Sequence, residues 1–129
     1  MSYQLRGVRK EIRDILRMTM ILMTGAFQEK YQQPKFVENS AEETYFRKIL
    51  TLLEEKNINE AENCLMEWIE MPELSQRNEV IQASMYFYQS VNELTDEQLE
   101  QADYSREEIL EGIQFVLETV GVNTAKGVI

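Results

Sequence analysis

Residues 45–69 read YFRKILTLLEEKNINEAENCLMEWI, with an apolar stripe on either side of a short polar turn. The apolar positions recur at intervals of three and four residues, which is the period of an amphipathic helix. The turn around Asn57 is so short that the two helices must lie antiparallel. The first helix is expected to end near Lys56 and the second before Pro72. The predicted core positions of this hairpin are Tyr45, Phe46, Ile49, Leu50, Leu52, Leu53, Ala61, Cys64, Leu65, Trp68 and Ile69.

The starts of other helices are marked by a Ser, Thr or Asn followed three residues later by Glu or Gln. In this pattern each of the two side chains can bond a free backbone amide of the first turn. We assign it at residues 40–43, 59–62, 95–98 and 105–108, and Ser75 is a further candidate for an N-cap. Gly121 is the expected stop of the last helix. The predicted core positions of these later helices are Val80, Ile81, Ser84, Phe87, Tyr88, Val91, Ile109, Ile113, Val116, Leu117 and Val120.

The N-terminal segment has the pattern of one long amphipathic helix, from residue 3 to about residue 32. Pro34 makes a longer helix unfavourable, because proline disfavours helical geometry in the residue before it. The polar face of this helix is basic and carries Arg6, Lys10, Arg13 and Arg17. Its predicted apolar stripe consists of Leu5, Val8, Ile12, Ile15, Leu16, Thr19, Leu22, Met23 and Ala26.

Together these patterns predict an all-α fold of about six helices. No segment alternates between apolar and polar residues for long, and only five Gly and two Pro are present to make turns between strands. With 129 residues, the chain has the size of one domain. We expect a long N-terminal helix, residues 1–33, and a body of tetratricopeptide-like helical hairpins, residues 40–121, in an orthogonal array.

Charge is distributed unevenly along the chain, whose net charge is −10. Residues 1–40 carry seven Lys and Arg against four Asp and Glu, whereas residues 41–129 carry six against 19. The basic first segment is therefore expected to contact its own acidic body, the body of a second copy, or an anionic partner.

The hairpin resembles a tetratricopeptide unit in the run 56–61, Lys-Asn-Ile-Asn-Glu-Ala, followed by Leu65, Trp68 and Ile69. In that family a small residue, here Ala61, lets the two helices of a unit approach closely. Lys56 replaces the usual turn glycine, and no second copy follows at the family's period of ~34 residues. The resemblance implies one tetratricopeptide-like hairpin and no solenoid.

As a whole, the chain also resembles a family of uncharacterised small helical proteins from Gram-positive bacteria. The features that carry this resemblance are the basic first helix, the run NEAEN at residues 59–63, and the closing pattern from Leu94 through YSREEILEG at residues 104–112. This resemblance implies the fold and no activity.

Catalytic and metal-binding chemistry is not expected. Histidine, the usual general base and a common metal ligand, is absent, and the chain has no glycine-rich phosphate loop. Cys64 lies on an apolar stripe, where a packing role is expected rather than nucleophilic reactivity. The carboxylates at residues 96–111 lack the spacing of a calcium loop, and several fall in first turns, where negative charge is favourable. We therefore expect that this protein is not an enzyme and that it has no cofactor and no metal site.

Nucleic-acid binding and membrane spanning are not expected either. The acidic body would repel nucleic acid. The apolar run from Ile15 to Phe27 is only 13 residues long and contains Arg17, so it is too short to span a bilayer. The single cysteine fits a reducing compartment, and we expect a cytoplasmic protein.

The run from Met18 to Met23 is the candidate interaction site. Helical geometry places Leu22 and Met23 on the core stripe but Met20 and Ile21 on the side of Arg13 and Arg17, so this turn is apolar all round. The candidate site residues are Arg13, Arg17, Met18, Met20, Ile21 and Met23.

Three explanations of this apolar turn remain open. We favour a non-catalytic helical protein–protein interaction module that forms a homodimer through the first helix, with a further, unidentified protein partner as an option. The alternative function is a peripheral protein that lies on an anionic membrane through its basic amphipathic first helix. The third explanation is that the helix simply threads the centre of its own domain.

Overall fold

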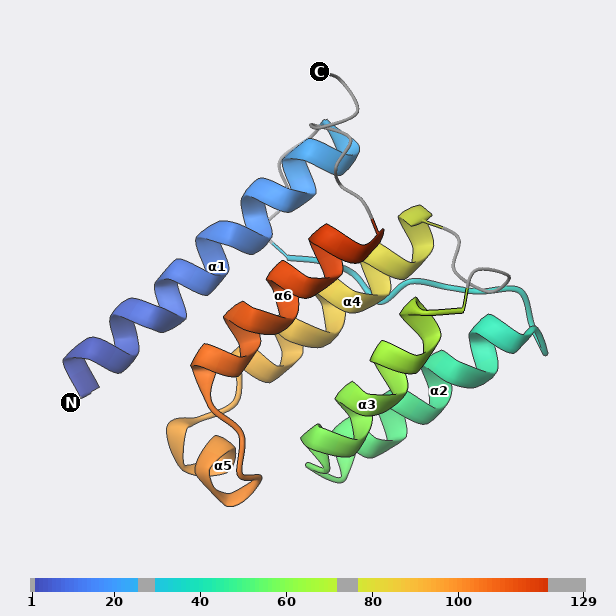
Figure 1. Cartoon of the computed structure of the whole chain (residues 1–129). Coiled ribbons are helices and arrows are strands. Elements are labelled where there is room, and N and C mark those ends of the chain that lie inside the picture. Colours follow the sequence, from blue (N-terminus) through green and yellow to red (C-terminus); the bar gives the residue numbers. More distant parts are fainter. Residues whose placement is uncertain (1, 26–29, 72–76, 121–129) are drawn as a thin grey trace.

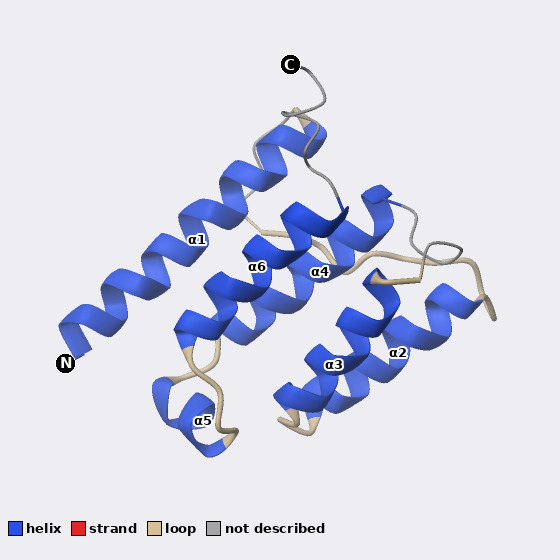
Figure 2. Ribbon diagram, in the orientation of Figure 1, coloured by secondary structure: helices blue, strands red, loops and turns tan. Residues whose placement is uncertain are grey.

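The computed structural model describes residues 2–25, 30–71 and 77–120, and within these ranges it contains six helices and no strand (Figures 1 and 2). The all-α prediction is confirmed. The helices are α1 (Ser2–Thr24), α2 (Ala41–Glu54), α3 (Ile58–Ile69), α4 (Arg77–Asn92), α5 (Asp96–Gln101) and α6 (Arg106–Val120).

Helices α2 and α3 form the predicted antiparallel hairpin (Figure 1). The Trp68 side chain is fully buried, and Phe46 and Ile49 of α2 are also buried. Lys56 in the connecting turn has a φ of 63°, the left-handed conformation that glycine adopts most easily. The predicted core positions of α3 are all buried, whereas Tyr45, Leu50, Leu52 and Leu53 are only partly covered.

Helices α1, α4 and α6 pack against one another and make up the other half of the molecule. Helices α4 and α6 pack together, α1 contacts both of them, and short α5 connects them at one end (Figure 1). Every predicted core position of α4 is buried, as are four of the five predicted in α6. A single cluster of buried apolar side chains extends from α1 through α4 and α6 into the α2–α3 hairpin.

The predicted end of the first helix near residue 32 is wrong, because α1 ends at Thr24. Gly25 follows with a φ of 74°, and this left-handed geometry terminates a helix at little cost when the residue is glycine. Residues 31–37 contain no helix and run from the side of α1 across α4 toward α2 (Figure 1). Phe36 in this segment packs edge-on against Phe46 and Trp68, with ring centroids 5.4 Å apart in both pairs.

Three of the predicted helix starts are confirmed by their hydrogen bonds. The Ser40 hydroxyl accepts from the Glu43 amide, and the residue pairs 95 with 98 and 105 with 108 each exchange both bonds of a capping box. The start at residues 59–62 is wrong, because α3 begins at Ile58 and the side chain of Asn57 makes no cap bond. Ser75 and Gly121 lie outside the described residues.

Candidate functional site

Helix α1 has one buried face and two flanks of different chemistry. Ile12, Leu16, Thr19 and Met20 are buried. Leu22, which the sequence pattern placed on the core stripe, is instead 74% exposed. The buried face is rotated relative to the predicted stripe because α1 packs against both α4 and α6, so its orientation depends on tertiary contacts as well as on apolar spacing.

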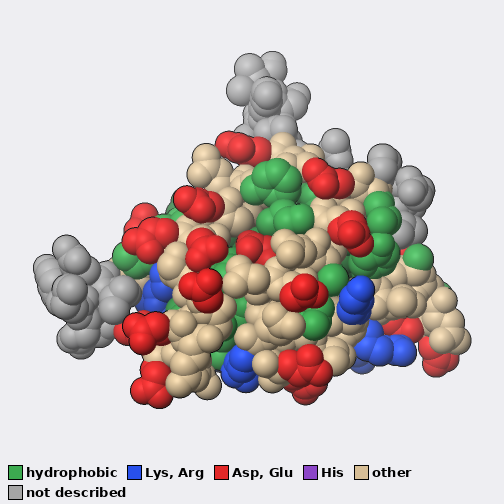
Figure 3. Space-filling model, turned by 60° about the horizontal axis from the view of Figure 1, so that its bottom comes forward, with side chains coloured by type: hydrophobic (Ala, Val, Ile, Leu, Met, Phe, Trp, Pro, Cys, Tyr) green, Lys and Arg blue, Asp and Glu red, His purple; other side chains and the backbone are tan. Residues whose placement is uncertain are grey.

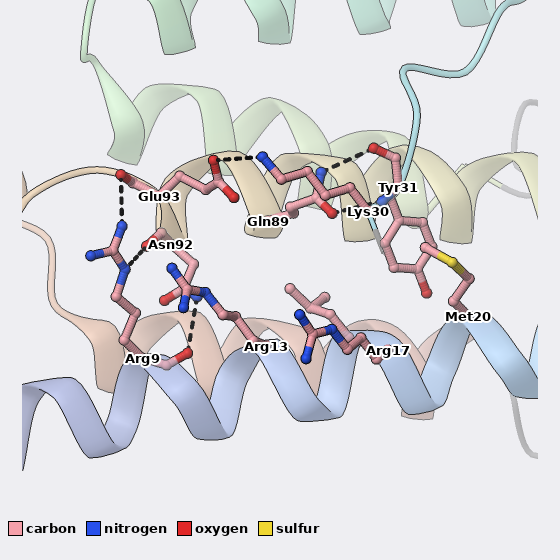
Figure 4. A pocket seen from close by; sticks show the side chains of 10 residues that line it. Arg9, Arg13, Arg17, Met20, Lys30, Tyr31, Gln89, Asn92 and Glu93 are labelled. Atoms are coloured by element: carbon pink, nitrogen blue, oxygen red, sulfur yellow. Dashed lines mark hydrogen bonds and ion pairs between the residues drawn. The ribbon is translucent and has the colours of Figure 1, made fainter. Parts of the chain in front are cut away.

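One flank of α1 lines a pocket of about 270 Å³ between α1, α4 and residues 30–31 (Figure 4). The side chains of Arg9, Arg13 and Arg17 leave α1 on the side that faces α4, one turn after another (Figure 4). Of the site residues predicted from sequence, the structure brings Arg13, Arg17 and Met20 together here. The pocket is lined by Arg9, Arg13, Leu16, Arg17, Met20, Lys30, Tyr31, Gln89, Asn92 and Glu93.

Arg9 anchors α1 to the C-terminal end of α4. Its Nε donates to the Asn92 carbonyl at 3.0 Å and its second terminal nitrogen to the Glu93 carbonyl at 3.1 Å, while Asn92 Nδ2 donates back to the Arg9 carbonyl. Cations are favoured at the end of a helix, where carbonyls lack helical partners. Burial, followed by repulsion from the nearby Arg106 and Arg13, lowers the pKa of Arg9. This guanidinium is therefore held in a place already rich in positive charge.

Gln89 fixes the opposite wall of the pocket. Its Oε1 accepts from the Tyr31 amide at 2.7 Å, and its Nε2 donates to the Tyr31 carbonyl at 3.0 Å. These two hydrogen bonds hold the backbone at Tyr31 against α4. The Tyr31 ring is buried and extends toward α1 beside Met20 (Figure 4). At the rim, Lys30 and Glu93 form an ion pair of 3.4 Å.

Arg13 and Arg17 are much less engaged than Arg9. The Arg17 guanidinium lies 4.0 Å from Asp14, whose carboxylate is closer to Lys10, at 3.1 Å. Arg13 is exposed and forms no hydrogen bond or ion pair with any residue in the described part of the chain. Among the described residues, most N–H donors of these two guanidinium groups beside the pocket therefore have no acceptor.

The other flank of α1 exposes apolar side chains. Met18 is 63% exposed, Ile21 43% and Leu22 74%. The predicted site residues Met18 and Ile21 therefore lie away from the pocket, whereas Met20 is buried inside the protein's own fold. The backbone of Met23 belongs to α1, but its side chain lies outside the described residues.

Sequence reasoning missed the half of the pocket that Lys30, Tyr31 and Gln89 provide. Residues 30–31 were expected to continue the first helix, which would have carried Tyr31 away from α4. Gly25 is the signal that could have indicated an earlier helix end. The pairing of Gln89 with the Tyr31 backbone has no local sequence pattern, because the two residues are 58 positions apart.

Two further observations concern the described residues as a whole. Over residues 2–25, 30–71 and 77–120, no cluster of three or more carboxylate, thiol or imidazole groups is arranged to hold a metal ion. None of the helices in the same ranges is both long enough and apolar enough to cross a membrane.

Comparison with known proteins places the chain in a family. No curated protein and no solved structure is significantly similar to it. A family model described as "Family of unknown function (DUF6483)" matches residues 7–121, a range that begins in α1 and includes all five later helices. The chain therefore belongs to the DUF6483 family.

Proposed function

We propose that this protein is a non-catalytic helical interaction module that self-associates through the outward flank of α1. The supporting observation is where its exposed apolar side chains lie. Five large apolar side chains are exposed in the part of the chain whose side chains are described, and three of them, Met18, Ile21 and Leu22, fall within about one turn of α1. Such clustering is typical of an interface, whereas single exposed apolar residues are ordinary.

A second copy of the chain is the partner that the charge distribution favours. The first 40 residues are basic and the rest is strongly acidic. A twofold arrangement brings each α1 toward the acidic body of the other copy, and Figure 3 shows Asp and Glu side chains spread over one face of the molecule. Self-association would then bury the apolar turn and bring opposite charges together.

Sedimentation of two matched variants tests this proposal. Leu22→Glu places a charge in the proposed interface, and Val37→Glu places one on an equally exposed apolar residue outside α1. Wild type and Val37→Glu are expected to sediment as dimers at high micromolar concentration, and Leu22→Glu as a monomer with unchanged helical content. A monomeric wild type, or two variants that behave alike, would contradict the proposal. Met20 is unsuitable for this test because it is buried within the subunit.

The tetratricopeptide-like features of the α2–α3 hairpin support the proposal that this protein is an interaction module. Ala61 is completely buried, as expected of the small residue that allows close helix contact in that family. Lys56 has the left-handed conformation at the position of the family's turn glycine. We place the module in the cytoplasm, where a single reduced cysteine such as Cys64 is stable.

Membrane-surface binding is the second candidate function. The exposed Met18 and Leu22 share α1 with Lys10, Arg13 and Arg17, so apolar and basic groups are available on the same helix. This function predicts salt-sensitive co-sedimentation with vesicles containing phosphatidylserine and none with pure phosphatidylcholine. Absence of binding to the anionic vesicles at low salt would remove it.

A further inference from the structure

The pocket beside α1 concentrates positive charge that the described residues do not neutralise. Arg9, Arg13, Arg17 and Lys30 line it together with a single carboxylate, that of Glu93. Glu93 pairs with Lys30, and Arg9 is bound to the end of α4. The Arg13 guanidinium has no ion pair among the described residues, and that of Arg17 has a long one, 4.0 Å from Asp14; both side chains leave α1 on the side of the pocket (Figure 4). An anion placed between α1 and α4 would be attracted by both guanidinium groups.

A buried hydroxyl points to the same place. Tyr31 is only 7% exposed, and its Oη has no hydrogen-bond partner among the described residues. Leaving a buried hydroxyl unpaired is costly, so such a group calls for an explanation. Burial raises the pKa of Tyr31, so the hydroxyl keeps its proton and can donate it in a hydrogen bond near neutral pH. The donor reaches toward α1 beside Met20, on the side of Arg17 (Figure 4).

The remaining wall of the pocket is apolar. Leu16, Met20 and the ring of Tyr31 are buried and line the same cavity. A volume of about 270 Å³ is slightly below the usual range for ligand sites, which begins at about 300 Å³. The cavity therefore suits a small molecule with one charged end and one apolar end.

We propose that this pocket binds a small phosphate monoester, with Arg13, Arg17 and the Tyr31 hydroxyl contacting the phosphoryl oxygens and Leu16 and Met20 contacting the apolar part. The planar guanidinium of arginine can donate two parallel hydrogen bonds to two oxygens of one phosphoryl group. A monoester carries close to two negative charges near neutral pH, whereas a carboxylate carries one. The dianion neutralises both guanidinium groups, so the pocket selects phosphate over carboxylate. Binding at this flank is independent of self-association, which uses the opposite flank.

Titration calorimetry with phenyl phosphate and with benzoate tests the assignment, because the two probes share a ring and differ in the anion. The wild type is expected to bind phenyl phosphate about tenfold more tightly than benzoate. Arg13→Gln should weaken phenyl phosphate binding by about tenfold, since it removes a charged donor. Arg13 is exposed and has no structural partner in the described part of the chain, so this variant should fold.

Lys10→Gln is the matched control. It removes the same charge from the same helix, but Lys10 does not line the pocket and pairs with Asp14. Its phenyl phosphate affinity should stay within about twofold of the wild type. An equal loss in Lys10→Gln and Arg13→Gln would mean that the effect is general electrostatics and would overturn the proposal. Absence of saturable phenyl phosphate binding, or equal affinity for benzoate, would overturn it as well.

Tyr31→Phe separates a ligand-binding role from a structural one. The change removes only the hydroxyl, so the unliganded variant should keep or exceed the thermal midpoint of the wild type. Its phenyl phosphate affinity should fall by about fivefold. A lower thermal midpoint with unchanged affinity would show that the hydroxyl serves the fold and would contradict the proposal.

The phosphate monoester can come from a free molecule or from a lipid headgroup. Vesicles of phosphatidylcholine containing phosphatidic acid present the same group on a surface. Binding of phenyl phosphate together with Arg13-dependent vesicle binding indicates the lipid, and binding of phenyl phosphate alone indicates a free molecule. Either result supports phosphate binding in the pocket. Absence of binding to both phenyl phosphate and the vesicles would overturn the pocket proposal, but it would not affect the sedimentation test of self-association.

Discussion

Gly112 of α6 is a single residue on which the packing of α4 against α6 depends. A Cβ atom at this position would overlap the phenol ring and hydroxyl of Tyr88, which is itself fully buried. Tyr88 belongs to α4, so the absent side chain at residue 112 allows these two helices to approach closely. Such a requirement arises only when two distant segments meet and has no signature in the local sequence.

Gly112→Ala is therefore expected to destabilise the fold by about 1–3 kcal/mol through overpacking, despite the better helix propensity of alanine. Gly7→Ala in α1 is the matched control, because nothing lies within 4 Å of a Cβ atom there. That variant should be neutral or more stable, by up to about 1 kcal/mol. Urea unfolding of both variants measures the difference, and equal free energies of unfolding would show that the contact with Tyr88 is absent.

Glu62 is a partly buried acid held between two tyrosines. Its Oε2 accepts from the Tyr88 hydroxyl at 2.6 Å and from the Tyr104 hydroxyl at 2.9 Å. Burial raises the pKa of Glu62, the two tyrosine bonds partly offset this shift, and the charges of Glu108 and Glu111 add to it. The sequence pattern assigned Glu62 to a helix cap with Asn59, but Asn59 instead donates to the carbonyls of residues 102 and 103.

The raised pKa of Glu62 predicts a specific pH dependence of stability. Because the folded protein holds this proton more tightly than the unfolded chain, protonation stabilises the fold, and this contribution disappears as the pH rises through the folded pKa. Wild type should gain stability relative to Glu62→Gln as the pH falls from about 7 to below the ordinary value of 4.5. The difference between their free energies of unfolding isolates this one group, and a gain in the opposite direction would contradict the assignment.

Among the elements, α1, α4, α5 and α6 are connected by hydrogen bonds at the C-terminal end of α4. Arg106, only 4% exposed, donates to the carbonyl and side-chain oxygens of Asn92, to the Leu94 carbonyl and to Asp96. Arg9 binds the same helix end from the α1 side. The local sequence indicates the capping box at residues 105–108 but not the role of Arg106, because the partners of Arg106 lie 10 to 14 positions away.

Arg106→Gln is expected to cost about 3 kcal/mol, because it leaves several buried acceptors without a partner. Arg47→Gln removes an ion pair of similar length, Arg47 to Glu43 at 2.9 Å, on the exposed side of α2. That change should cost less than about 1 kcal/mol. Thermal unfolding of the two variants compares them, and a small effect of Arg106→Gln would show that the helix end does not need this cation.

The turn between α2 and α3 makes a second prediction for an element. Lys56 adopts the left-handed conformation without the freedom of glycine, so Lys56→Gly should stabilise the protein by about 1 kcal/mol. Lys48→Gly in the exposed middle of α2 should cost about as much. Opposite changes in denaturation midpoint are the expected outcome. Destabilisation by both changes would argue against a strained turn.

Elements that depend on local spacing were predictable, and those that depend on distant contacts were not. The starts of α2, α5 and α6 followed from capping residues that lie within four positions of each other. The path of residues 30–37 depends on Gln89 and on aromatic contacts of Phe36, which periodicity cannot indicate. The end of α1 was misplaced because an apolar pattern continues beyond Gly25.

At the scale of the whole molecule, the same limits apply to the candidate site. Sequence indicated Arg13, Arg17 and an apolar turn on the first helix, and these features lie on two different flanks of α1. It could not indicate which apolar side chains the body covers, because α1 packs against both α4 and α6. Met20 is consequently buried within the subunit, while Leu22 is left outside.

The proposed self-association would place the outward flank of α1 against a second copy of the chain. The most direct measurement is an isotope-filtered nuclear Overhauser experiment on a mixture of labelled and unlabelled protein, which detects only contacts between copies. Self-association through this flank predicts intermolecular signals from the methyl groups of Met18, Ile21 and Leu22. Intermolecular signals confined to other surfaces, or none at concentrations well above micromolar, would contradict it.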